Sequence, residues 1–174
     1  GSLVHALEGH TNWVTSACVS PDGRHVVTAS SDKTARVWDL ESGATLRTLE
    51  DHTGEVWAVD CVRVAGGWRI VTGCGDGNVY VRDGESGELL QTLKWHTRGV
   101  WSVACARVDD AWRVATASND CTARVFDVER GASLATLEGH TGMLNAIACV
   151  VVARAFRFLF ARKRRERRRR SIRI

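Results

Sequence analysis

The chain has 174 residues, of which 44% are hydrophobic and 25% are charged, a composition typical of globular proteins. No apolar run reaches the roughly eighteen residues that a membrane-spanning helix needs, and the N-terminus does not have the build of a signal peptide. We therefore expect an intracellular protein, cytoplasmic or nuclear, with no membrane partner.

The formal net charge of +4 hides a division of the chain into two parts. Residues 153–174 contain eleven Lys or Arg and one Glu, which is a balance of +10. Residues 1–152 contain 13 basic and 19 acidic residues, which is a balance of −6. The composition thus predicts an acidic body followed by a basic tail.

The first well-patterned region, residues 12–49, divides into four short segments. They are rich in Val, Thr, Ala and Leu, they partly alternate between polar and apolar side chains, and turns containing Gly or Asp separate them. Because Gly and Asp tolerate the backbone geometry of tight hairpins, we expect an antiparallel meander. The predicted strands are residues 13–20, 25–30, 34–39 and 44–49.

Residues 55–93 and 99–137 repeat this pattern, and the same polar residues recur in each repeat. Asp and Thr recur at steps of 44 residues, and His at steps of 42, 44 and 44: Asp32, Asp76 and Asp120; Thr28, Thr72 and Thr116; His10, His52, His96 and His140. Asp, His and hydroxyl side chains could form the proton relay of a hydrolase. A catalytic group occurs once per active site, however, whereas a group present in every unit serves folding. We interpret these residues as structural and expect no enzyme.

A fourth unit begins at His140 and is incomplete. Its first strand is residues 143–152, and residues 156–161 match residues 112–117, but the positions of the repeat Thr and Asp then hold Phe160 and Arg164. We therefore expect a repeat domain over residues 1–161 and a tail without regular structure over residues 162–174. The full units lie at about 12–49, 55–93 and 99–137, and the partial unit lies at 143–161.

A unit of about forty residues with four antiparallel strands is typical of a propeller blade. The predicted fold is all-β: a partial β-propeller with three full blades and a fragment of a blade at each end, residues 3–8 being the last strand of a preceding blade. Closed propellers have about four to eight blades. The open edges are therefore expected to be covered by further blades or by self-association with another copy.

The pairs Gly9-His10, Gly139-His140 and Trp38-Asp39, at this spacing, resemble the signature of the WD-repeat β-propeller family over roughly residues 1–152. The resemblance implies a structural chain of hydrogen bonds in each blade, from the Trp indole through a Ser or Thr and the His to the hairpin Asp. In the first blade the members would be Trp38, Thr28 or Ser30, His10 and Asp32.

The later blades depart from the signature, because Arg82 and Phe126 stand at the Trp position. These blades are expected to keep only the other members, at a cost of about 1 kcal/mol for each missing bond. The remaining members would be Thr72, His52 and Asp76 in one blade, and Thr116, His96 and Asp120 in the next.

The resemblance also implies a rigid platform that holds a protein or peptide partner on its top face. The implied contact positions are Trp13, Thr15, Ser31, Glu55, Trp57, Gly75, Trp101, Asn119, Met143 and Asn145. Large aromatic side chains on a rigid surface are the usual anchors of an interface. The alternative for Trp57 and Trp101 is that they are half-buried packing residues of the first strand of each blade.

The cysteines do not predict a metal or disulfide set. Cys61, Cys105 and Cys149 each lie nine residues after a repeat His, inside an apolar stretch, and no CxxC pair occurs. No Gly-rich phosphate loop, HExxH or GxSxG motif occurs either. We expect reduced thiols, no metal and no cofactor.

The tail has eight basic residues among the nine of residues 162–170. One interpretation is a solvated charge run or a translation artefact. The other is a nuclear-import or nucleic-acid-binding segment, since clustered Arg binds phosphates through counterion release.

Overall fold

The computed structural model describes residues 4–108, 111–152, 155–161 and 171–173. The basic run 162–170, and with it the expected nucleic-acid contact, lies outside the described residues. The regular elements in the described ranges are all β-strands, so they include no helix that could cross a membrane.

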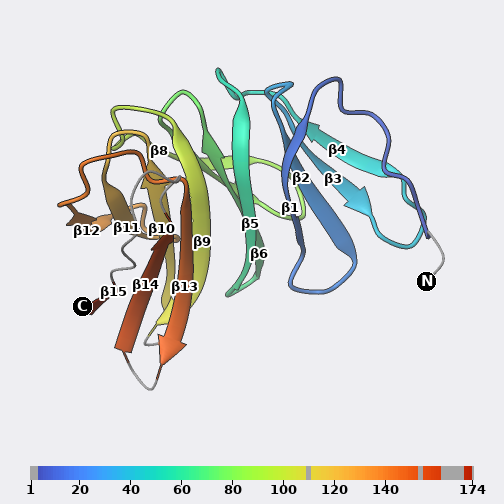
Figure 1. Ribbon diagram of the computed structural model, residues 1–174. Coiled ribbons are helices and arrows are strands. Elements are labelled where there is room, and N and C mark those ends of the chain that lie inside the picture. The colour runs from blue at the N-terminus through green and yellow to red at the C-terminus, as the bar shows by residue number, and fades with distance from the viewer. Residues whose placement is uncertain (1–3, 109–110, 153–154, 162–170, 174) are drawn as a thin grey trace.

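The strands form four sheets, each built from consecutive strands that pair antiparallel in chain order (Figure 1). Blade 1 contains β1 (Val14–Val19), β2 (His25–Ser30), β3 (Ala35–Asp39) and β4 (Thr45–Leu49). Blade 2 contains β5 (Val56–Val64), β6 (Gly67–Cys74), β7 (Val79–Asp83) and β8 (Leu89–Leu93). Blade 3 contains β9 (Val100–Val108), β10 (Ala111–Ser118), β11 (Ala123–Asp127) and β12 (Ser133–Leu137). The last sheet contains β13 (Ala146–Val152), β14 (Ala155–Ala161) and β15 (Ser171–Arg173).

The predicted meanders are confirmed in all three full blades, and their registers agree. The repeat threonine on the second strand lies opposite the same position of the third strand in each blade: Thr28 opposite Arg36, Thr72 opposite Tyr80, and Thr116 opposite Arg124. Residues 171–173, which we expected in an irregular tail, form β15 and pair with β14.

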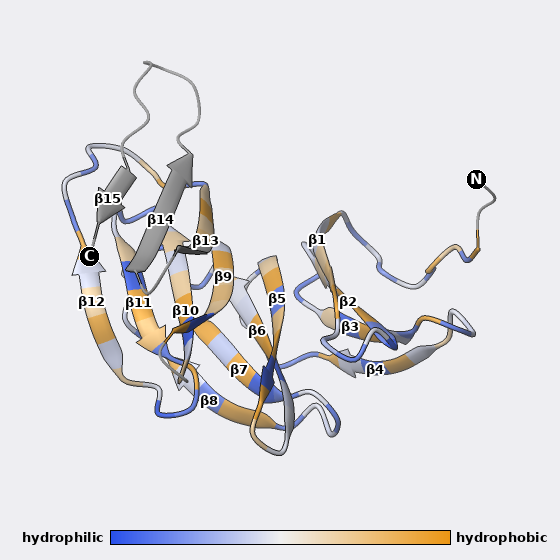
Figure 2. Cartoon of the chain, turned by 90° about the horizontal axis from the view of Figure 1, so that it is seen from below, coloured by the Kyte–Doolittle hydropathy of each residue, from blue (hydrophilic) through white to orange (hydrophobic). Residues whose placement is uncertain are grey.

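The sheets stand side by side with their first strands, β1, β5, β9 and β13, lining one side of the array (Figure 1). The hydrophobic core lies between neighbouring sheets. Between blades 1 and 2, for example, Val37 and Leu49 pack with Val56, Trp68 and Ile70. Figure 2 shows the apolar bands that cross the middle sheets and the hydrophilic turns between the strands. A blade therefore buries its two faces only when it has a neighbour on each side.

Blade 1 lacks such a neighbour on one side among the described residues. Val14 of β1 is 53% exposed, whereas Val56, which has the same place in blade 2, is 0% exposed. Residues 4–10 form no strand, but His5 lies against Gly43 in the β3–β4 turn, as Leu49 lies against Gly87 one blade later. The segment around His5 thus follows the path of an outer strand from a preceding blade.

Candidate functional site

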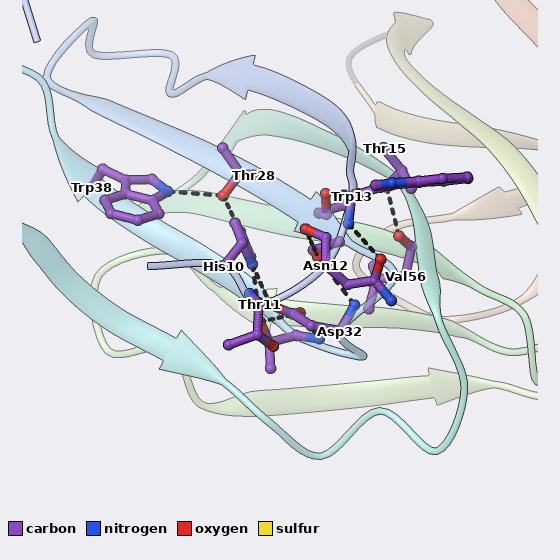
Figure 3. A network of polar contacts seen from close by, with 12 residues as sticks. His10, Thr11, Asn12, Trp13, Thr15, Thr28, Asp32, Trp38 and Val56 are labelled. Atoms are coloured by element: carbon purple, nitrogen blue, oxygen red, sulfur yellow. Dashed lines mark hydrogen bonds and ion pairs between the residues drawn. The ribbon is translucent and has the colours of Figure 1, made fainter. Parts of the chain in front are cut away.

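A chain of side-chain hydrogen bonds crosses blade 1 (Figure 3). The Trp38 indole N–H donates to Thr28 Oγ1 over 2.8 Å, and Thr28 Oγ1 lies 2.7 Å from His10 Nε2. His10 Nδ1 lies 2.7 Å from Asp32 Oδ2. Because a carboxylate only accepts, His10 Nδ1 donates to Asp32, and in the tautomer with its proton on Nδ1 the Nε2 atom accepts from the Thr28 hydroxyl. Thr28, not Ser30, is therefore the partner of the indole.

Asp32 anchors the end of this chain. Its carboxylate also accepts from the Thr34 hydroxyl at 2.7 Å and from the Thr11 backbone N–H at 3.1 Å. Burial alone would raise the pKa of Asp32, but the hydrogen bonds from Thr34 and His10 outweigh it, and the pKa lies well below its usual value. Ser30 supports the same turn, because its hydroxyl accepts from the Asp32 backbone N–H at 3.0 Å.

Blade 3 repeats the arrangement without the indole. His96 lies 2.7 Å from both Asp120 Oδ2 and Thr116 Oγ1, and Phe126 is fully buried at the Trp position. The pKa of Asp120 is lowered to about 2, because the bonds from Thr122 and His96 outweigh the effect of burial. Burial lowers the pKa of His96 even though Asp120 opposes the shift.

The hydrogen bonds of blade 2 follow a different pattern. His52 Nε2 lies 2.9 Å from Thr72 Oγ1, but His52 Nδ1 has no hydrogen-bond partner among the described residues, and the expected bond between His52 and Asp76 is not formed. Asp76 Oδ2 accepts instead from the Thr53 hydroxyl at 2.6 Å and the Tyr80 hydroxyl at 2.7 Å. The ring of Tyr80 packs edge-on against His52, with centroids 4.7 Å apart.

Arg82 takes the Trp position of blade 2, and its side chain is only 3% exposed. Its Nη2 forms an ion pair with Asp51 Oδ1 over 2.8 Å. Asp51 immediately precedes the repeat His52, in the place that Gly9 holds before His10. The two departures of this blade from the family signature therefore compensate each other. A signal for this pair was present in the sequence, because both departures fall in one unit and have opposite charges.

The aspartate that ends each third strand has a role that the sequence reasoning missed. Asp83 Oδ1 accepts from the backbone N–H of Ser86 over 2.9 Å and so holds the turn after β7, while Asp83 Oδ2 pairs with Arg69 over 2.8 Å. Asp127 pairs with Arg113 in the same way in blade 3. Arg69 and Arg113 are 44 residues apart, so the repeat period could have identified them.

On the top face, where the first strands begin, the structure separates the tryptophans by role. Trp57 is half-buried and stacks on Trp101, with centroids 4.1 Å apart and planes 15° apart. Its ring also lies so close to Gly99 that a Cβ there would come within 2.2 Å of it. Trp57 is thus a packing residue, whereas Trp101 is 39% and Trp13 is 82% exposed.

Three polar residues of the expected contact set, Ser31, Glu55 and Asn119, lie around the Trp57–Trp101 stack. Glu55 Oε2 accepts from the Trp57 indole at 2.9 Å and from the Ser31 hydroxyl at 3.3 Å. The Trp101 indole donates to Asn119 Oδ1. The Ser31–Glu55 bond joins blade 1 to blade 2, and the Trp57–Trp101 stack joins blade 2 to blade 3.

The other expected contact residues have different surroundings. Thr15 Oγ1 donates to the Val56 carbonyl at 2.6 Å (Figure 3) and so joins β1 to β5. Gly75 lies beside the Trp57 ring. Met143 is exposed and Asn145 is half-buried on the loop before β13.

In the described part of the chain, no three His, Cys, Asp or Glu side chains are arranged to hold a metal ion.

Curated proteins match short parts of the chain. The probable E3 ubiquitin ligase complex SCF subunit sconB of Aspergillus oryzae is 48% identical over 50 residues, which are 29% of this chain and 7% of that protein. The nuclear distribution protein PAC1 of Candida albicans is 37% identical over 68 residues, covering 36% of this chain and 14% of that protein. The chain thus spans only a small part of the length of these relatives.

Solved structures match the fold over most of the chain. The crystal structure of RRP9 WD40 repeats superposes with a TM-score of 0.78 at 21% identity, covering 89% of this chain and 46% of that one. The structure of U3-55K matches equally well, with the same TM-score and 47% of that chain covered.

The sequence also matches a family model three times, over residues 1–39, 43–83 and 87–127. These matches cover well over half of the chain, and their breaks fall in the turns between the third and fourth strands of blades 1 and 2. The chain therefore belongs to the WD40 family, described as WD domain, G-beta repeat.

Proposed function

We propose that this chain is a non-catalytic scaffold that binds a protein or peptide partner on its top face. The observation that carries the proposal is the exposure of Trp13, Trp101 and Met143 at or just before the starts of the first strands. Exposed aromatic and Met side chains on a rigid surface are typical interface anchors, because they bury much apolar area at a small cost in entropy. The ring of Trp101 stacks on the half-buried ring of Trp57, which packs against Gly99.

The internal contacts of the polar residues favour binding over catalysis. His10 and His96 are each held between a threonine and an aspartate inside a blade. A general base must reach a substrate proton, but both ring nitrogens of each histidine are hydrogen-bonded within the blade. The relatives named above support the proposal further, since one is a subunit of a ubiquitin ligase complex.

The test is to select binding peptides from a displayed random library and to measure their dissociation constants by calorimetry. Trp101→Ala and Trp13→Ala should each weaken binding by about tenfold or more. The matched controls are Leu46→Ala and Leu134→Ala, which remove exposed apolar side chains from the outer strands β4 and β12. Selected peptides that bind the Trp13→Ala, Trp101→Ala double variant as tightly as the parent chain would contradict the proposal.

A second candidate function is nucleic-acid binding through the basic run 162–170, and the charge division of the chain favours it. An acidic body repels phosphate, so binding to DNA or RNA would depend wholly on the tail and would weaken steeply as salt rises. Deleting residues 162–174 should abolish that binding and leave peptide binding on the top face unchanged. Undiminished RNA binding by the truncated chain would rule out the tail as the contact.

A further inference from the structure

The first strands of blades 1 and 2 are joined by three side-chain contacts along their length. Thr15 Oγ1 donates to the Val56 carbonyl over 2.6 Å, and the Val59 backbone N–H donates to Ser16 Oγ over 3.4 Å. Further along the strands, Cys18 Sγ lies 3.0 Å from Cys61 Sγ. Both cysteines are free thiols, both are partly accessible, and both pack at the edge of the core between the two blades.

The same place in the next two junctions shows what is particular to this pair. Strand pairing makes Cys18 equivalent to Asp60 and Ala104, because the residues opposite them, Val27, Val71 and Ala115, are 44 apart. Cys61 is likewise equivalent to Cys105 and Cys149.

The partners in those two junctions are not thiols. The Cys105 backbone N–H donates to Asp60 Oδ2 over 2.7 Å, and the Cys149 thiol donates to the Ala104 carbonyl over 3.4 Å. At all three junctions, the first strand of the later blade thus carries a cysteine: Cys61, Cys105 or Cys149. Only Cys61, between blades 1 and 2, faces another cysteine.

We propose that Cys18 and Cys61 are a reversible redox pair, whose oxidation by a peroxide joins blade 1 to blade 2 through a disulfide. One sulfur, after losing its proton, attacks a peroxide oxygen; the O–O bond breaks, and a sulfenic acid and water form. The second sulfur then attacks the sulfenic sulfur, the S–O bond breaks, and a second water leaves with the remaining proton. Sulfur is oxidised and peroxide oxygen is reduced.

The geometry needs only a small movement to complete this step. The sulfurs must approach by about 1 Å to reach the disulfide bond length of about 2.05 Å. The hydrogen bond with Cys18, together with burial, raises the pKa of the Cys61 thiol. Because the thiolate is the nucleophile, a raised pKa slows the attack of Cys61 on a peroxide.

The disulfide would act where the array is weakest. Blade 1 packs against a neighbouring sheet on one face only among the described residues, as the exposure of Val14 shows. A covalent link across its single junction would keep it attached to blade 2 while the hydrophobic contacts there open and close. A bond between residues 43 apart also restricts the unfolded chain.

The experiment treats the full chain with hydrogen peroxide and maps its disulfides by mass spectrometry after blocking free thiols. Lys or Arg residues separate every two consecutive cysteines, so trypsin places each of the six on its own peptide. The cross-link between the peptides of Cys18 and Cys61 should be several-fold more abundant than any other pair, and dithiothreitol should remove it. The urea midpoint of unfolding should rise on oxidation and fall again on reduction.

Cys18→Ser should lose the cross-link and the shift in midpoint, whereas Cys149→Ser, the matched control at the junction after blade 3, should keep both. Cys18→Ala serves the same purpose if the serine variant does not fold. The proposal would be overturned if the parent chain gave only separate sulfenic or sulfinic acids at Cys18 and Cys61. A cross-link to Cys105 of equal abundance would overturn it as well, and mapping of the parent chain alone decides both outcomes.

Discussion

Blades 1 and 2 have the same strands in the same register, but their recurring polar residues are hydrogen-bonded in different ways. In blade 1 one continuous chain of bonds runs from Trp38 through Thr28 and His10 to Asp32. In blade 2 the chain is divided: His52 bonds only to Thr72, while Tyr80 takes over the bond to Asp76. The comparison teaches that a blade tolerates the loss of a signature residue when another side chain satisfies the polar group left behind.

The third-strand position shows the same principle. Trp38 fills the space beside Thr28 with an indole and supplies one N–H, whereas Arg82 fills it with a charged side chain. A buried charge is costly unless it is paired. Asp51 provides the pair, in a place where blade 1 has a glycine. Each blade is thus consistent internally, and single exchanges between them should be harmful.

The largest difference should come from removing the histidines. His10→Ala removes two hydrogen bonds from the chain, one to Asp32 and one to Thr28, and should lower the free energy of unfolding by about 2 to 3 kcal/mol. His52→Ala removes only one hydrogen bond and should cost about 1 to 2 kcal/mol, mostly in lost packing. Urea unfolding of both variants measures the two values, and equal losses would mean that the divided network of blade 2 is as strongly coupled as that of blade 1.

The ion pair of blade 2 can be broken from the exposed side. Asp51→Asn keeps the shape but leaves the charge of Arg82 buried without its partner, and should lower stability by about 2 kcal/mol. Adding Arg82→Met to this variant should recover most of the loss, because the double variant has no unpaired charge. Thermal unfolding of the single and double variants tests this compensation, and a double variant less stable than Asp51→Asn would refute it.

A smaller effect is expected from the indole alone. Trp38→Phe gives blade 1 the residue that blade 3 carries as Phe126 and removes the hydrogen bond to Thr28. Since Thr28 keeps its bond to His10, the cost should be about 1 kcal/mol. Chemical denaturation provides the measurement, with Trp112→Phe as a control for losing a tryptophan elsewhere. An unchanged midpoint would show that the indole contributes packing only.

The smallest effect concerns pH. Burial first, and then the charge of Arg82, lower the pKa of His52 below the usual value of about 6.5. The unfolded chain therefore binds more protons than the folded one below that value, so stability falls as pH decreases from about 7 to 5 and is unaffected above that range. His52→Gln should reduce this slope and leave the part due to His96, whose pKa burial also lowers.

Asp32 and Asp120 titrate at a lower pH than His52, so their pH range provides a control for this test. Hydrogen bonds hold the pKa values of Asp32 and Asp120 below 3.8, so their contribution to stability is complete above that value and is lost only in stronger acid. The slopes of stability against pH for the parent chain and His52→Gln should therefore differ between about pH 5 and 7 and be the same below about pH 4. A slope unchanged by the substitution would place the pH sensitivity elsewhere.

Much of the fold and part of the site could be predicted from repetition alone. The 44-residue step of Thr28, Thr72 and Thr116 marks one position of three equivalent strands, and equivalent strands give equivalent sheets. The alternative for Trp57 and Trp101 could not be decided in this way. Both occupy the same place in the repeat, yet the glycine at position 99 lets one ring sink between blades while the other stays exposed.

The sequence by itself determined the period, the all-β blades and the residues that could take part in each network, because these follow from local patterns that recur along the chain. Tertiary structure decided which of those residues bond to one another. Tyr80 replaces His52 as the partner of Asp76, Arg82 meets Asp51, and Cys18 meets Cys61 across two blades. The reason is that a hydrogen bond or a sulfur contact depends on distances of a few tenths of an ångström, and these are set by how neighbouring strands and sheets pack together.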